Sequence, residues 1–265
     1  LCMEKPLDKI KNLIYKKDGK IMTNAVRDWV NLEKEDKPIW DMMDMEKYIK
    51  KHEAGPKKGK RSFGISVGRG CVFKCTFCVN TAMGKSWRSI SAENMIERIK
   101  FLKEKHNIQH FSIVDDCFEL DMKRVEKFCN MLRDENIDIT WDVNVRAGKK
   151  WNDERLEMVA KAGCIMLSIG AESGSERVLK DIFHKGVTIG DILYMARKCN
   201  EYKIPLGTTW MCGIPNETEE DVEKTISLLK KVVKICPDST ISGPQPFRPY
   251  PNSELYFEAI KQGYK

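Results

Sequence analysis

The stretch Trp141-Asp-Val-Asn-Val-Arg146 alternates apolar and polar side chains, a period of two that is typical of a β-strand. Its tryptophan and two valines would share one face of a sheet, while Asp142, Asn144 and Arg146 would share the other. A packed apolar interior does not tolerate such a polar face unless its side chains are hydrogen-bonded or meet a polar ligand. The pattern therefore leaves two interpretations open, an interior that holds a ligand and an internal network of salt bridges.

On both sides of this stretch, from Phe63 onward, short apolar runs alternate with amphipathic segments, as in repeated strand-helix units. We expect six strands, near residues 63–69, 109–115, 139–146, 164–170, 205–212 and 239–247. We expect helices near residues 91–105, 121–135, 152–162, 174–182, 188–202 and 218–234. Ser91, Asn152 and Thr218 stand where three of these helices begin, and all three are good helix caps. The pattern predicts an α/β fold in which six parallel strands with outer helices form a partial (β/α)6 barrel.

Residues 1–62 contain few periodic segments, and we expect them to form an N-terminal connector that wraps around a core of residues 63–265. Within this connector, Asp18-Gly19 predicts a tight turn and Pro38-Ile-Trp40 predicts an extended stretch. The basic run Lys57-Lys-Gly-Lys-Arg61 predicts a solvated loop.

The composition is that of an ordinary globular protein, with 42% hydrophobic and 32% charged residues in a chain of 265. The formal net charge of +7 is spread along helix-like segments, so nucleic-acid binding is not favoured. Since no apolar stretch approaches the roughly 20 residues of a membrane-spanning helix, we expect no membrane span. Ten cysteines without a secretory leader indicate a reducing compartment, and we expect a cytoplasmic protein. The first residue is Leu1 rather than Met, and we expect a piece of a longer protein, truncated at both ends.

Three closely spaced cysteines follow the first predicted strand, in the sequence Gly70-Cys-Val-Phe-Lys-Cys-Thr-Phe-Cys78. In strand-helix barrels the sites form where the strands end, so Cys71, Cys75 and Cys78 can converge there on one small object. Thiolates suit zinc or iron-sulfur clusters, but a structural zinc site needs a fourth ligand, and the four histidines are scattered. A 4Fe-4S cluster with three protein ligands keeps one iron open. A distant fourth ligand and a redox dithiol at residues 75–78 remain as alternatives.

The other seven cysteines lie mostly in apolar or amphipathic stretches, and we expect them to pack as small hydrophobic side chains. They are Cys2, Cys117, Cys129, Cys164, Cys199, Cys212 and Cys236. Cys117 and Cys212 each follow a predicted strand at its carboxyl end, where sites form, although packing is the role we expect for both.

The cysteine loop, with the aromatic Phe77 just before the last cysteine, resembles the defining motif of the radical S-adenosylmethionine (SAM) superfamily. The resemblance implies a 4Fe-4S cluster on Cys71, Cys75 and Cys78, whose open iron binds the amino and carboxylate groups of SAM. An electron from the cluster would cleave SAM to a 5′-deoxyadenosyl radical, which abstracts a hydrogen atom from the substrate. The resemblance also implies an electron donor such as flavodoxin or ferredoxin.

Four further segments resemble motifs of this superfamily, and the first two resemble its branch that is associated with cobalamin. Ser168-Ile-Gly-Ala-Glu172 is similar to its fourth-strand element, and Val114-Asp-Asp-Cys-Phe118 to its acidic motif, although adjacent carboxylates also cap helices. The stretch Trp210-Met-Cys-Gly-Ile-Pro-Asn-Glu-Thr218 is similar to the turn beside the adenine, and Pro249-Tyr-Pro-Asn-Ser-Glu-Leu-Tyr256 to the closing segment. Both of these have an asparagine where the family has glycine. The resemblance implies that SAM is bound by Phe77, Asp115, Asp116, Arg146, Ser168, Glu172 and Met211.

The segment Pro38-Ile-Trp-Asp41 resembles the connector that joins a cobalamin-binding domain to the barrel in the same branch. We expect the chain to begin after that domain, so the use of cobalamin stays open. We expect a radical SAM enzyme for methylation, cyclisation or rearrangement at an unactivated carbon. The alternatives are a radical SAM enzyme that modifies nucleic acid, similar to methylthiotransferases, and a non-catalytic metal or iron-sulfur module. The sequence assigns neither the substrate nor a general acid or base.

Overall fold

The computed structural model describes residues 6–35, 37–52, 57–84 and 86–264, without the side chains of residues 82 and 83. The chain forms two compact units, Leu1–Lys37 and Pro38–Lys265. The larger unit includes residues 38–62 of the predicted connector, while the functional division at residue 62 stays a prediction.

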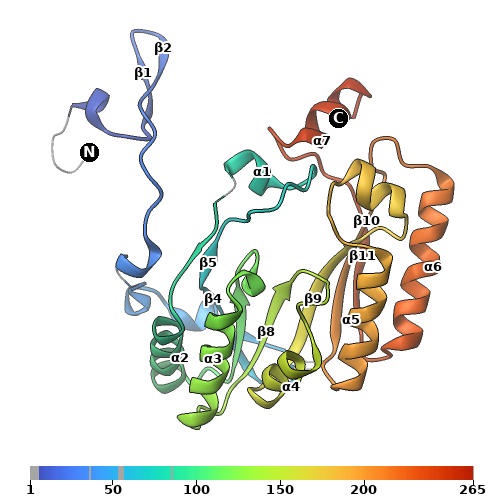
Figure 1. Ribbon diagram of the computed structural model, residues 1–265. Coiled ribbons are helices and arrows are strands. Elements are labelled where there is room, and N and C mark those ends of the chain that lie inside the picture. The colour runs from blue at the N-terminus through green and yellow to red at the C-terminus, as the bar shows by residue number, and fades with distance from the viewer. Residues whose placement is uncertain (1–5, 36, 53–56, 85, 265) are drawn as a thin grey trace. The chain divides into compact units, whose positions relative to one another are not determined.

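The smaller unit is built around a β-hairpin of β1 (Ile14–Lys17) and β2 (Lys20–Thr23) (Figure 1). Asp18 and Gly19 form its turn with φ angles of +49° and +76°, and two positive φ angles are typical of the tight hairpin turn that favours Asp-Gly. The tight turn predicted at Asp18-Gly19 is confirmed. Two short 3-10 helices, η1 (Leu7–Lys9) and η2 (Leu32–Lys34), complete the described elements of this unit.

A seven-stranded sheet forms the centre of the larger unit, in the order β11-β10-β9-β8-β7-β4-β3. Six strands are parallel, and they are β4 (Arg61–Ser66), β7 (His110–Val114), β8 (Thr140–Val145), β9 (Cys164–Glu172), β10 (Leu206–Cys212) and β11 (Thr240–Pro246). They confirm the predicted partial barrel. The short strand β3 (Lys50–Lys51), which was not predicted, extends the sheet antiparallel to β4. A small antiparallel ribbon of β5 (Gly68–Arg69) and β6 (Arg88–Ser89) follows β4 in the chain.

Helices run between the parallel strands, and Figure 1 shows α2 to α6 along one face of the curved sheet. The helices are α1 (Val79–Met83), α2 (Ala92–His106), α3 (Met122–Asp134), α4 (Asp153–Lys161), α5 (Ile189–Glu201), α6 (Glu219–Ile235) and α7 (Glu254–Lys261). The predicted caps are confirmed, because Ser91, Asn152 and Thr218 each accept a backbone N–H three residues further on. No described helix is long and apolar enough to cross a lipid bilayer.

Two predicted elements differ from the structure. The segment predicted as a helix over 174–182 contains a π-helix, η6 (Val178–Ile182), instead of a regular α-helix. The stretch predicted as extended around Pro38 ends at Ile39, because Trp40 begins the 3-10 helix η3 (Trp40–Met42). This turn buries the Trp40 ring against Phe101 of α2, with ring centroids 5.6 Å apart. Two more 3-10 helices are η4 (Met45–Lys47) and η5 (Phe118–Leu120).

Strand β8 has the two-faced character that its sequence predicts. Trp141, Val143 and Val145 are all buried, and the Trp141 ring packs against Phe128 of α3 with centroids 5.5 Å apart. The indole N–H of Trp141 donates to the Ala162 carbonyl at 2.8 Å, so the ring is buried without leaving its polar atom unpaired. Apolar burial under the helices therefore turns the polar face of β8 toward the other side of the sheet.

The sequence left two interpretations of this polar face open, an internal network of salt bridges and an interior with room for a ligand. The structure shows a network at one position along the strand and a cavity at another. Near the start of β8, Asp142 binds the imidazole of His110 at 2.7 Å, the hydroxyl of Ser112 at 3.0 Å and the ammonium of Lys57 at 2.5 Å. These groups form an internal network of hydrogen bonds and ion pairs. Further along β8, Asn144 and Arg146 line a cavity.

The network also corrects the expectation that the basic run at residues 57–61 is a solvated loop. Lys57 pairs with Asp142, Lys60 donates to the Thr140 hydroxyl at 3.0 Å, and Arg61 forms an ion pair with Glu46. Of the three lysines in the run, Lys58 alone has an exposed position. Polar partners on β8 and in η4 draw the run onto the sheet, and these partners are remote in sequence.

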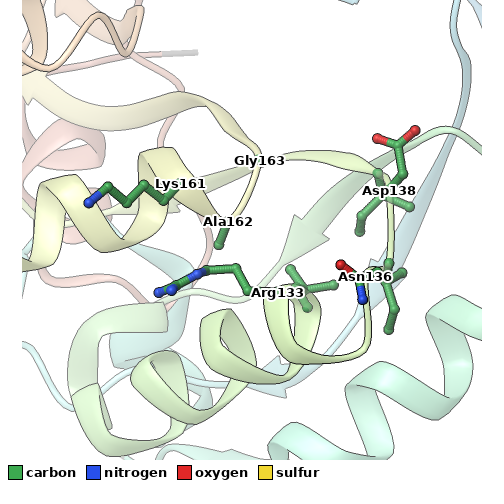
Figure 2. A pocket seen from close by; sticks show the side chains of 9 residues that line it. Arg133, Asn136, Asp138, Lys161, Ala162 and Gly163 are labelled. Carbon is green, nitrogen blue, oxygen red and sulfur yellow. The ribbon is translucent and has the colours of Figure 1, made fainter.

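A second cavity, of about 430 Å3, lies where α3 leads into β8 and α4 leads into β9. This is the opposite end of the strands from the cavity that Asn144 and Arg146 line. Figure 2 shows Arg133, Lys161 and Ala162 among the residues that line the second cavity. The amino-terminal ends of parallel barrel strands generally serve stability, whereas the carboxyl ends carry the chemistry. The functional site is therefore expected at the other end.

The Lys57–Asp142 pair gives a first test of the fold. We predict that Lys57→Met lowers the free energy of unfolding by about 1–3 kcal/mol, because it leaves a half-buried carboxylate without its cation. Lys58→Met removes the same charge from the neighbouring exposed position and is the control. Urea denaturation of both variants measures the effect, and equal stability of the two would show that the ion pair contributes nothing.

Candidate functional site

A cavity of about 290 Å3, the polar cavity, lies at the carboxyl ends of the central strands, where the cysteine loop meets β8, β9 and β10. All predicted site residues except Asp115 and Met211 line it. They are Cys71, Cys75, Cys78, Phe77, Asp116, Arg146, Ser168 and Glu172. The same cavity is also lined by Asn144, Thr209, Cys117 and Lys185, which were not among the predicted site residues. Strand ends and four strand-to-helix connections thus bring residues far apart in sequence to one place.

Glycine is required where the cysteine loop begins. Gly70 has a φ of +85°, and a Cβ atom there would lie 2.0 Å from the carbonyl oxygen of Ser86. The Gly70 N–H donates to a carboxylate oxygen of Asp116 at 3.0 Å. The close packing against the Ser86 carbonyl and the hydrogen bond to Asp116 together fix the position of the backbone just before Cys71.

The three thiols of the loop differ in their surroundings. Cys75 is buried, whereas Cys71 and Cys78 are half-buried. The pKa of Cys71 is lowered to about 6, chiefly by its contact with the Cys117 thiol and also by the Phe73 N–H and the charge of Arg146. Burial raises the pKa of Cys78. A lowered pKa favours the thiolate, which is the form that binds metals.

Cys117 is buried, as expected for a packing cysteine, but its sulfur lies 3.1 Å from the sulfur of Cys71 and it lines the cavity. The expectation for the other described cysteines is borne out for Cys129, Cys164, Cys199 and Cys236, which are buried, while Cys212 is half-buried. Cys2 lies outside the described residues.

The three thiols are suited to an iron-sulfur cluster. Within the described residues, no group of three histidine, cysteine or acidic side chains could hold one metal ion. Cluster-binding thiolates each bind a different iron, so they need to surround a common space rather than converge on one point. Three thiols on one loop, all lining one cavity, meet that requirement.

Arg146 brings positive charge to these thiols from the end of β8. Its guanidinium lies over the Phe73 ring at 3.8 Å from the centroid, and one of its nitrogens is 3.9 Å from the Cys75 sulfur. The backbone N–H of Arg146 donates to the Glu119 carboxylate at 3.1 Å. Glu119 is 2% exposed, and its other carboxylate oxygen has no hydrogen-bond partner in the described part of the chain. Burial raises the pKa of Glu119 to about 7.

Glu172 forms a buried ion pair that the sequence reasoning missed. The Lys185 ammonium lies 3.1 Å from a Glu172 oxygen and 5.5 Å from the centroid of the Phe77 ring. Gly170 makes room for this pair, because a Cβ there would lie 2.1 Å from that same oxygen and 2.9 Å from the ammonium. The glycine between Ser168 and Glu172 was the available signal that something approaches the strand closely. A paired acid and base beside the thiols can bind a ligand that carries both charges.

Asp115 and Met211 do not line the cavity. The Asp115 carboxylate is buried in an ion pair with Arg124 at 2.7 Å, and it accepts the Trp87 indole N–H at 3.0 Å and the Cys117 N–H at 2.9 Å. These contacts anchor the loop that carries Asp116 and Cys117. Met211 is half-buried on β10. Contact of either residue with SAM stays a prediction.

The two asparagines in expected glycine positions have the required backbone. Asn216 and Asn252 have φ angles of +65° and +67°. Asparagine tolerates these left-handed angles better than other side chains, so both turns keep the shape that glycine would allow.

Two curated relatives match nearly the whole chain. An uncharacterized methyltransferase of Pyrococcus horikoshii is 30% identical over 263 residues, which are 98% of this chain and 54% of the relative. An anaerobic magnesium-protoporphyrin IX monomethyl ester cyclase of Rubrivivax gelatinosus is 25% identical, over 91% of this chain and 42% of its own length. The chain thus spans about half the length of these relatives.

Among solved structures, the cobalamin-dependent SAM radical enzyme OxsB has the same fold. Its structure with aqua-cobalamin and SAM bound matches 99% of this chain and 37% of its own chain, with a TM-score of 0.74 and 21% identity. At this identity, the likeness extends to the fold alone.

The buried carboxyl group of Glu119 gives a pH test of the site. Because its pKa in the folded protein is about 7 and its ordinary value is 4.5, the folded state favours the neutral acid, and stability falls as the pH rises through this window. We predict that wild-type protein loses about 2–3 kcal/mol relative to Glu119→Gln between pH 5 and pH 8. Urea denaturation across this range measures the difference, with Glu223→Gln on an exposed helix position as control. Parallel curves for wild type and Glu119→Gln would contradict the prediction.

The family model named Radical SAM superfamily matches residues 65–229, which is more than half of the chain. The matched region begins in β4, contains the three cysteines of the loop, and continues through β10 into α6. It therefore includes every residue that lines the polar cavity. The relatives and the fold agree with this match, and the chain belongs to the radical SAM superfamily.

Proposed function

We propose that the polar cavity holds a 4Fe-4S cluster and SAM, and that the protein cleaves SAM reductively to a 5′-deoxyadenosyl radical. Cys71, Cys75 and Cys78 would bind three irons, and SAM would occupy the fourth. The observation that carries this proposal is the convergence of the three thiols with a buried acid-base pair in one cavity. When bound, the cluster supplies the electron that cleaves SAM.

The side chains of the cavity would orient SAM between the cluster and the strand ends. Glu172 and Lys185 offer opposite charges to a ligand that carries a carboxylate, an ammonium and a sulfonium group. Phe77, Asp116, Arg146 and Ser168 would complete the SAM site, while Asp115 would act through the loop that it anchors.

We propose that the radical serves methylation or cyclisation at an unactivated carbon, because the two relatives are named as a methyltransferase and a cyclase. Cobalamin is a proposed second cofactor, since the OxsB structure is described as cobalamin-dependent. No cobalamin ligand is assigned to the described residues. The electron would come from a small redox protein of the flavodoxin or ferredoxin class.

The alternative of a methylthiotransferase-like enzyme has less support. The sequence contains one group of three closely spaced cysteines and no second one. Its positive charge is spread along helix-like segments, apart from the basic run at residues 57–61, where Lys57, Lys60 and Arg61 contact partners within the protein.

Cysteine replacement tests the proposal directly. After anaerobic reconstitution with iron and sulfide, we expect about four irons per wild-type chain and almost none for Cys71→Ala, Cys75→Ala or Cys78→Ala. Cys129→Ala removes a buried cysteine of α3 and is the control. On addition of SAM and dithionite, the wild type and the control should form 5′-deoxyadenosine, measured by mass spectrometry.

The same assay with and without cobalamin distinguishes the later chemistry. Formation of S-adenosylhomocysteine that depends on cobalamin would indicate methyl transfer. An intact cluster that fails to cleave SAM would contradict the proposed activity for this chain.

The ion pair beside the cluster gives a binding test. We predict that Lys185→Met and Glu172→Gln each raise the dissociation constant for SAM by about 10- to 100-fold, because each removes a charge-assisted contact. Lys180→Met, at a nearby exposed position, is the control. Equilibrium dialysis on reconstituted protein measures binding without turnover, and unchanged affinity in both cavity variants would exclude a role for the pair.

A further inference from the structure

Thr76, between the second and third cysteines of the loop, has all its polar groups in hydrogen bonds although it is 3% exposed. Its hydroxyl donates to the Ile182 carbonyl at 2.6 Å, and its backbone N–H donates to the Phe183 carbonyl at 3.0 Å. Its own carbonyl accepts the Leu255 N–H at 3.0 Å. None of these partners is near Thr76 in sequence, so the loop is held by tertiary contacts.

The first two partners belong to the end of the π-helix η6. The Phe183 N–H donates to the Val178 carbonyl at 2.8 Å, a bond across five residues that is characteristic of a π-helix. A helix end leaves its last carbonyls without partners inside the helix. Thr76 supplies two donors to two such carbonyls, those of Ile182 and Phe183. The shape of η6 and the position of the cysteine loop therefore depend on each other.

The side chains that flank this contact extend it into the cavity. Phe77 packs edge-on against Phe183, with ring centroids 4.6 Å apart. Lys185 follows in the same segment and pairs with Glu172. The segment after η6 thus contacts the cysteine loop on one side and the acidic end of β9 on the other.

The third partner belongs to the first turn of α7. Ser253 caps this helix by accepting the Tyr256 N–H, and the Leu255 N–H is one of the donors that a helix start leaves free. The Thr76 peptide therefore lies between the end of one helix and the start of another. Its donors face the carbonyl end of η6 and its acceptor faces the amide end of α7, which is the favourable orientation for both.

We propose that Thr76 is a positioning residue for the cluster, and that its hydroxyl and backbone set the directions of the Cys75 and Cys78 sulfurs by joining η6 to α7. The inference rests on the proposed cluster site. Valine has nearly the same shape as threonine but lacks the hydroxyl, so it would leave the carbonyl of the half-buried Ile182 without this donor. Serine retains the hydroxyl and loses a methyl group.

Thr76→Val and Thr76→Ser test the proposal together. We expect reconstituted Thr76→Val to lose iron to a chelator about tenfold faster than wild type, since one hydrogen bond that holds the cysteine loop is removed. Its reduced cluster should give an altered electron paramagnetic resonance spectrum, and Thr76→Ser should restore both properties. Thr208→Val removes another buried hydroxyl, on β10, and controls for general destabilisation because its cluster release and spectrum should match wild type.

Hydrogen exchange of cluster-free protein gives an independent measurement. In Thr76→Val, amide exchange should rise in residues 71–78 and 178–185 and stay unchanged in β8. The proposal would be overturned if Thr76→Val had the same iron release rate, spectrum and amide exchange as the wild type. It would also be overturned if Thr76→Ser were as impaired as Thr76→Val. Failure of the wild type to take up a cluster would instead overturn the proposed function, and the inference with it.

Discussion

The arrangement of this molecule depends on the need to pair the carboxylates on the inner face of the sheet. The outer face of β8 is buried under aromatic and aliphatic side chains, so its polar side chains have to face inward. Unpaired charges there would cost several kcal/mol each. Asp142 is neutralised by Lys57 and bonded to His110, while Glu172 is neutralised by Lys185. Each pairing draws in a segment from outside the sheet.

These pairings divide the inner face into a closed part and an open part. Around Asp142, the side chains of His110, Ser112 and Lys57 all contact one carboxylate oxygen and form a closed network. Toward the carboxyl ends of the strands, the exposed Asn144 lines a cavity. The polar side chains of β8 thus stabilise the sheet near its start and line a cavity with room for a ligand near its end.

The open part is built by loops that hold each other in place. Asp115 anchors the loop of Asp116 and Cys117, and Asp116 holds the start of the cysteine loop through Gly70. Thr76 connects that loop to η6, whose following residues reach Glu172 through Lys185. We therefore expect a change in one loop to shift the positions of both the thiols and the Glu172–Lys185 pair. This mutual support is what a site needs to present several groups to one ligand.

The sequence by itself determined the six parallel strands, most of the helices and the cysteine loop, because alternation, caps and close spacing are local signals. The inward direction of Arg146 and Glu172 also followed from the period of the strands. Only the tertiary structure decided that Lys57 neutralises Asp142, that Lys185 faces Glu172, and that Asp115 is turned away from the cavity. It also decided the contact of Thr76 with Ile182, which are 106 residues apart. Such contacts depend on how separate units of the fold meet, and no local periodicity records where two distant segments touch.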